Sequence, residues 1–273
     1  SPAPFHMKQF LAFNKLNKPV FIEKPLSRTL DELKKFNISN NTFSMVGYIL
    51  RFHPTLNKIK KIIDAETYGK VLCADIEVGQ FLPDWRPQSD YRKGVSAIKK
   101  LGGGVLLELS HEIDYATWLF GNPTSLFCSS RKLSNLDLDV EDYANLIFEY
   151  GDKNVSIHLD FLQRKPQMIF KIVFEQGTVI ADLIRNELIL KSPAGKDRLI
   201  RHISRKDSNE DYIRQFDFLF YKSLKGYKPA FSETKKFKNY CTFDQAKNTM
   251  NIIDIAKKSN SEGKRIFLKG KKL

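Results

Sequence analysis

Two predicted β-hairpins in the second half of the chain limit its fold more than any other feature of the sequence. Every second residue is apolar over 144–150 and again over 155–161, with a Gly-Asp turn between the two runs. Segments 168–174 and 178–183 repeat the arrangement around a Gln-Gly turn. Consecutive hairpins form an antiparallel sheet, and one face of that sheet needs cover from other elements.

Two helices near the end of the chain are expected to help cover this face. The first spans 209–224, and the second begins at a capping box formed by Thr242 and Gln245. The first helix carries four apolar residues on one side: Ile213, Phe216, Phe220 and Leu224.

The first 53 residues predict the opposite kind of strand pairing. A helix over 5–16, a strand over 20–23, a helix after the capping box at Thr29, and a strand over 43–50 follow one another. This order is typical of α/β proteins and implies parallel strands.

The middle of the chain joins the two patterns. A helix begins at Pro54 and runs to about residue 66, and a strand follows over 71–78. A polar, aromatic loop over 81–100 leads to three glycines and a helix over 105–120. The sequence therefore predicts an α/β fold with a parallel segment before a large, mainly antiparallel sheet.

Charge and cysteine content narrow the classes of function. The net charge is +14, but the Lys-Lys pairs are spread along the whole chain and form no single stripe. This spread favours a solvated surface over a nucleic-acid interface, although the field would also favour an anionic small molecule. The three cysteines are far apart and in no Cys-x-x-Cys motif, so neither a disulfide framework nor a metal site is expected.

Membrane attachment is not expected either. No apolar run approaches the roughly 18 residues that span a bilayer, and no basic region precedes an apolar stretch at Ser1. We expect a cytoplasmic protein with a small-molecule partner, and neither a nucleic acid nor a membrane as a partner.

Lys24 is the first candidate for chemistry. It follows the predicted parallel strand 20–23, and open α/β sheets bind ligands at the carboxyl ends of their strands. Pro25 would fix the backbone after it, and a partly buried lysine can exchange a proton with a substrate hydroxyl. A surface lysine beside a turn proline is the alternative.

Glu108, His111 and Asp114 form a second candidate. They lie three residues apart on the helix after the glycines and so project from one face. A histidine between carboxylates suits a general base for a hydroxyl proton. A hydrogen-bonded structural histidine and a Glu-x-x-His metal site are the alternatives, and the metal lacks further ligands at a suitable spacing.

Aromatic and arginine side chains supply candidate substrate contacts, because aromatic faces stack on sugars and arginine binds oxygens. A polar surface loop would look similar. Three candidates lie in the loop after residue 81, and two more follow predicted strands: Trp85, Arg86 and Tyr91, with Arg51 and Arg164.

Together these residues resemble the Gfo/Idh/MocA family of NAD(P)-dependent sugar and polyol oxidoreductases. The resemblance covers essentially the whole chain. It is carried by these segments: Pro4 with His6, Val20–Ser27, Arg51–Pro54, Tyr68–Lys70, Gly102–Asp114, Trp118–Gly121, Ala256–Ser259 and Gly263–Arg265.

The resemblance implies a fold, a cofactor and residue roles. Residues 1–53 would be the C-terminal part of a Rossmann domain. Residues 54–273 would form a substrate-binding and oligomerisation domain, and the last helix of this domain would pack back on the first domain. NAD or NADP would serve as the cofactor. The substrate would be a sugar or polyol, and anionic and nucleotide-linked sugars are among the options. Lys24 and His111 would be catalytic, with Glu108 a further candidate. The cofactor-binding residues would be Pro4, His6, Glu23, Lys24 and Pro25. The substrate-binding residues would be Arg51, Trp85, Arg86, Tyr91, Asp114 and Arg164.

The sequence also departs from the family pattern. Leu107 stands four residues before the histidine, where members of the family have Asp, and the carboxylate is Glu108. No Gly-x-Gly-x-x-Gly turn follows a first strand, so the pyrophosphate-binding loop is missing, as though the chain began partway through the Rossmann domain. We therefore expect an oxidoreductase in its full-length form, with a non-enzymatic sugar-binding or oligomerising module as the alternative.

Overall fold

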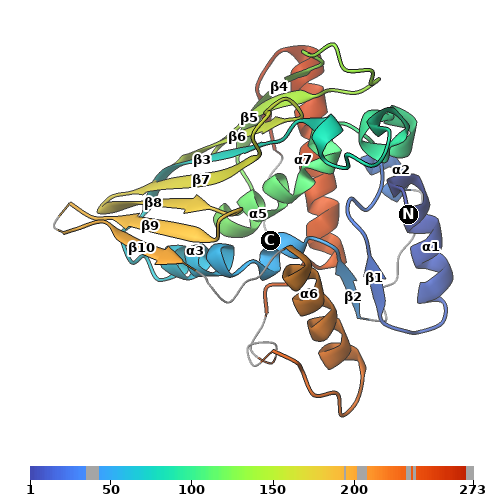
Figure 1. Ribbon diagram of the computed structural model, residues 1–273, viewed down its shortest axis with the longest axis horizontal. Coiled ribbons are helices and arrows are strands. Elements are labelled where there is room, and N and C mark those ends of the chain that lie inside the picture. Colours follow the sequence, from blue (N-terminus) through green and yellow to red (C-terminus); the bar gives the residue numbers. More distant parts are fainter. Residues whose placement is uncertain (35–42, 194, 202–207, 232–234, 236–237, 269–273) are drawn as a thin grey trace.

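The computed structural model describes residues 1–34, 43–193, 195–201, 208–231, 235 and 238–268. Two sheets organise this part of the chain (Figure 1). The smaller sheet pairs β1 (Val20–Ile22) with β2 (Ser44–Val46) in parallel, as the sequence predicts. Two helices accompany it, α1 (Ala3–Asn14) and α2 (Leu30–Lys34), and α1 packs against β1.

The larger sheet has nine strands in the order β10-β9-β8-β7-β3-β6-β5-β4-β11. All neighbours are antiparallel except β3 and β6, which are parallel. Its strands are β3 (Val71–Gly79), β4 (Ser125–Arg131), β5 (Tyr143–Glu149), β6 (Asn154–Asp160), β7 (Gln167–Phe174), β8 (Gly177–Asp182), β9 (Glu187–Lys191), β10 (Arg198–Arg201) and β11 (Ile266–Phe267). The predicted mixed α/β fold, with a parallel segment before an open and mainly antiparallel sheet, is confirmed.

The hairpins β5–β6 and β7–β8 lie where the alternating segments predict them. Strand β3 enters between them and pairs with both β6 and β7. On β5, Leu146 and Phe148 are buried on one face whereas Ile147 is 42% exposed on the other. Because side chains alternate along a strand, one face of the sheet forms the core and the opposite face stays open.

Helices α3 (Pro54–Asp64), α5 (Ser110–Phe120) and α7 (Phe243–Glu262) accompany the sheet (Figure 1). Tyr115 and Phe120 of α5 contact the ring of Phe170 on β7, with centroids 5.7 and 6.1 Å apart. Helix α7 begins at the predicted Thr242 capping box and packs along β4, where the Ser259 hydroxyl accepts the Cys128 N–H at 3.0 Å. Helix α7 also contacts α2 and β2, so it links the two sheets.

The expectation for the helix over 209–224 is wrong in one respect. Helix α6 (Ser208–Ser223) packs through Phe218 and Leu219 against Phe52 of the short 3-10 helix η1 (Ile49–Phe52), and not on the large sheet. Asp211 and Gln215 share its buried side. The four apolar residues expected to cover the sheet are 37–54% exposed: Ile213, Phe216, Phe220 and Leu224. The side of α6 that carries Asp211, Gln215, Phe218 and Leu219 faces the protein instead.

Two further elements are shorter than predicted. The expected strand 43–50 gives way to η1 after Val46, and the expected helix 105–120 is interrupted at Leu109, which separates α4 (Val105–Glu108) from α5. Among the described residues, no helix is both long and apolar enough to cross a membrane.

Candidate active site

Lys24 connects the small sheet to the helix that carries His111. It lies two residues beyond the end of β1, and a cis peptide bond joins it to Pro25. Its Nζ donates a hydrogen bond of 2.7 Å to the backbone oxygen of Glu108, at the end of α4. The Glu108 side chain is engaged separately, because it accepts the Ser96 hydroxyl at 3.0 Å. Lys24 and the start of α5 are therefore held next to each other.

His111 is held in a form that suits a base. Its ring lies edge-to-face on Tyr48 with centroids 5.5 Å apart, and its Nδ1 is buried with no hydrogen-bond partner among the described residues. Burial lowers the pKa of His111 well below its usual 6.5, and the nearby Lys24 charge lowers it further. The imidazole is thus neutral at neutral pH, with a ring nitrogen left for a ligand.

A cavity of about 640 Å³ opens beside His111. Its walls come from the α4–α5 junction, the end of β3, the start of β7 and the turn after β8. Trp85 also lines it, packed edge-to-face on Phe161 with its Nε1 donating to the Gln80 oxygen at 3.0 Å. Most of the lining is apolar: Ile49, Leu50, Val78, Leu109, Pro166, Met168, Leu183 and Ile184.

Two residues of this cavity that were not predicted from the sequence, Glu112 and Asn186, each carry a buried polar atom without a partner among the described residues. Glu112 is only 1% exposed, and burial raises the pKa of its carboxyl group from 4.5 to about 8. Glu112 Oε2 and Asn186 Oδ1 are both buried without a partner among the described residues. The sequence signal for Glu112 was its place next to His111 on a helix whose other carboxylate, Asp114, was already a site candidate.

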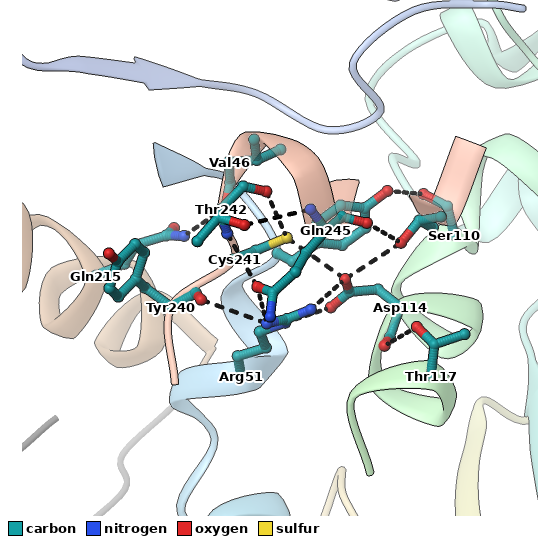
Figure 2. A network of polar contacts seen from close by, with 12 residues as sticks. Val46, Arg51, Ser110, Asp114, Thr117, Gln215, Tyr240, Cys241, Thr242 and Gln245 are labelled. Carbon is teal, nitrogen blue, oxygen red and sulfur yellow. Dashed lines mark hydrogen bonds and ion pairs between the residues drawn. The ribbon is translucent and has the colours of Figure 1, made fainter. Parts of the chain in front are cut away.

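Arg51 and Asp114 form a buried ion pair (Figure 2). Their side chains are 2% and 1% exposed, and two hydrogen bonds join them: Nε to Oδ2 at 2.8 Å and Nη2 to Oδ1 at 2.9 Å. Arg51 also donates to Gln245 Oε1 at 2.8 Å and to the Tyr240 oxygen at 3.3 Å. Each charge is bound by the other, and neither residue is among the described residues of the cavity wall. The pair therefore supports the structure around the site, and the substrate contact expected of both residues stays a prediction.

Three other expected substrate contacts do not line this cavity in the described part of the chain. Arg164 stacks on the ring of Phe81, 3.5 Å from its centroid, and the Tyr91 hydroxyl accepts the Asp137 N–H at 3.1 Å. Arg86 accepts the Ser89 hydroxyl at its backbone oxygen. Of the aromatic and arginine candidates, Trp85 alone meets His111 at the described cavity wall.

The expected cofactor residues lie around α1 and β1. The two ring nitrogens of His6 are 2.7 Å from the Pro25 oxygen and 2.6 Å from the Ser1 oxygen. His6 and Glu23 line a separate hollow of about 160 Å³, and Pro4 lies in the first turn of α1. No three His, Cys, Asp or Glu side chains in the described ranges are grouped as metal ligands.

Sequence comparison finds one family model. Residues 56–180 match the GFO/IDH/MocA C-terminal domain. An inositol 2-dehydrogenase of Rhodococcus jostii is 36% identical over 78 residues, which are 27% of this chain and 21% of that protein. A second one, from Mycolicibacterium smegmatis, is 36% identical over 76 residues, 26% of this chain and 22% of that protein. The matched segments therefore span about a fifth of these relatives.

Solved structures share the fold over nearly the whole chain. A levoglucosan dehydrogenase in complex with NADH superposes with a TM-score of 0.81 at 17% identity, covering 98% of this chain and 78% of that one. An inositol dehydrogenase homologue from Azotobacter vinelandii, complexed with NAD+, gives 0.78 at 14% identity, with 98% and 77% covered. The WlbA dehydrogenase of Bordetella pertussis, in complex with NADH and UDP-GlcNAcA, gives 0.75 at 17%, with 99% and 78% covered.

The ion pair generates a first prediction. Arg51→Met leaves the Asp114 carboxylate buried without its counter-charge, and we expect the free energy of unfolding to fall by about 3–5 kcal/mol in urea denaturation. The double variant Arg51→Met/Asp114→Leu should recover most of this loss. Arg92→Met, at the exposed pair with Asp90, is the matched control and should change stability far less. A single Arg51 variant as stable as the parent would contradict the assignment.

Glu112 generates a second prediction, on pH. The folded chain keeps the Glu112 proton up to about pH 8, whereas the unfolded chain releases it near 4.5. Its contribution to stability is therefore complete below pH 4.5 and is lost as the pH rises towards 8, with a slope of at most about 1.4 kcal/mol per pH unit. Glu112→Gln should flatten this slope in denaturation curves from pH 5 to 8. Equal slopes in both proteins would refute the shift.

Proposed function

We propose that the full-length protein is an NAD(P)-dependent oxidoreductase, and the match of residues 56–180 to the GFO/IDH/MocA C-terminal domain supports this proposal. Its substrate is a sugar or polyol, and hydride passes between a hydroxyl-bearing carbon and the nicotinamide. The observation that carries the proposal is the placement of Lys24 against the α4–α5 junction, beside a histidine whose buried Nδ1 has no partner among the described residues.

His111 and Lys24 divide the proton chemistry between them. The neutral imidazole of His111 accepts the hydroxyl proton of the substrate during oxidation and returns it during reduction. The Lys24 ammonium polarises the same oxygen and stabilises the negative charge that develops on it. A bound nicotinamide would take or supply the hydride. The apolar walls of the cavity exclude water and so strengthen both interactions.

The residues at the end of β1 fit the nicotinamide end of a dinucleotide. Open α/β sheets bind ligands at the carboxyl ends of their strands, and Lys24 occupies that position on β1. We assign Pro4, His6, Glu23, Lys24 and Pro25 to the cofactor side. The NAD+ and NADH complexes among the structural neighbours support this assignment. We propose NAD or NADP as the dinucleotide.

Trp85 supports a sugar or polyol as substrate, since an aromatic face at the cavity wall stacks on a sugar ring.

We further propose that the open face of the large sheet, where Phe127 and Ile147 are exposed, forms a homo-oligomer interface. A sugar-binding or oligomerising module without catalysis is the second candidate, because the cavity wall with Trp85 and the exposed sheet face require no dinucleotide.

The test is turnover with NAD+ and NADP+ across a panel containing myo-inositol and levoglucosan, followed by absorbance of the reduced nicotinamide. His111→Ala should lower kcat by at least about 100-fold, and Lys24→Ala should likewise abolish turnover, with circular dichroism and melting temperature unchanged. Lys171→Ala, on β7, is the matched lysine control. Near-parental rates in both site variants would refute the catalytic roles. Sugar binding with no dinucleotide binding would favour the non-catalytic module.

A further inference from the structure

Glu112 is a buried acid at the cavity that the proposed hydride transfer does not use. It lies on the first turn of α5, next to His111, and lines the same cavity. Its Oε2 is shielded from solvent and accepts no hydrogen bond within the described part of the protein. A buried polar atom without a partner costs about 1–3 kcal/mol, so such atoms normally have a ligand or an ordered water to bind.

A second unpartnered atom lines the cavity from another element. Asn186 follows β8, in a left-handed backbone conformation with φ of 57°, and its Oδ1 is likewise buried without a partner among the described residues. Together with His111, three described residues of the lining thus each carry a buried polar atom without a partner among the described residues. This pattern is typical of a pocket that orients a ligand through a few hydrogen bonds.

The charge of the lining indicates which ligand fits. None of the described residues that line the cavity is a lysine or arginine, whereas Glu112 and Asp211 are acids. The Lys24 charge also acts on Glu112, but the proposed function places that ammonium at the reacting hydroxyl. A carboxylate or phosphate beside Glu112 would therefore meet no lysine or arginine among the described residues of the wall. Burial favours the uncharged form of Glu112, and a neutral carboxyl group can both donate and accept a hydrogen bond. A hydroxyl group has the same two capacities.

We propose that Glu112 is a specificity-determining residue that binds an uncharged hydroxyl of the substrate, with Asn186 Oδ1 accepting a second hydroxyl. The inference rests on the proposed function for the identity of the cavity as the substrate site. It narrows the substrate class to one that presents uncharged, neighbouring hydroxyl groups at this end of the cavity. Any acidic group of the substrate would lie away from Glu112.

The experiment is calorimetric binding without dinucleotide, using myo-inositol, levoglucosan and glucuronate as probes. The full chain is compared with Glu112→Leu, Glu112→Gln and the exposed control Glu66→Gln. For the neutral probe that binds best, we expect Glu112→Leu to weaken binding about tenfold or more, since one hydrogen bond is lost and its partner is left unpaired. Glu112→Gln should weaken it by less than about threefold, and the control should not change it.

Infrared difference spectra give a readout that a merely structural role would not move. The protonated carboxyl band of Glu112, identified by its loss in Glu112→Gln, should shift when the neutral probe binds. The proposal is overturned if the carboxyl band does not shift, or if the Glu112→Leu variant binds the neutral probe as tightly as the parent. It is also overturned if the parent binds glucuronate but neither neutral probe, or if it binds none of the three probes.

The two proposals can fail separately. A chain that binds a neutral probe through Glu112 but transfers no hydride contradicts the proposed function and supports this inference. A chain that oxidises a polyol with unchanged kcat and KM after Glu112→Leu supports the function and overturns the inference. Melting temperatures of all variants exclude unfolding as the cause of lost binding.

Discussion

The buried pair of Arg51 and Asp114 is the interaction on which the site depends. Removing two charges from water is costly, and the cost is offset only where geometry and further hydrogen bonds are good. Here the guanidinium is shared by Asp114 on α5, Gln245 on α7 and the Tyr240 backbone oxygen (Figure 2). The Asp114 carboxylate is further approached by Cys241 Sγ and the Thr249 hydroxyl, at 3.5 and 3.4 Å. This network fixes α5 relative to η1 and α7, and His111 and Glu112 project from the helix that it fixes.

The elements that local patterning determines could be predicted from the sequence. The alternating hairpins, the capping box at Thr242 and the parallel order of the first segment each depend on neighbouring residues, and each lies where expected. The position of β3 could not be predicted, because a strand's partners in a sheet are chosen by contacts distant in sequence. The exposed side of α6 was misjudged for a related reason: spacing identifies stripes on a helix, but only packing shows which stripe is buried.

For the candidate site, as for the fold, the sequence pointed to single residues but not to the contacts between them. Lys24 and His111 were predicted from motif positions, and the structure brings their segments together through the Glu108 backbone oxygen. Arg51 and Asp114 were recognised as unusual, but pairing partners cannot be read from spacing, and they bind each other rather than the cavity. Glu112 was overlooked because a glutamate on a helix is usually solvated, and only the burial of this face reveals the unsatisfied oxygen.

The parallel pairing of β3 with β6 has a consequence for how the protein assembles. Strand β3 precedes α5 in the chain, yet its two neighbours, β6 and β7, come after it. Closing such a long loop costs entropy before the new contacts repay it, whereas the hairpins form from adjacent segments. We therefore expect the hairpins to fold early and β3 to join them late. Because the end of β3 supplies one wall of the cavity, we expect the ligand site to be among the last parts of the molecule to form during folding.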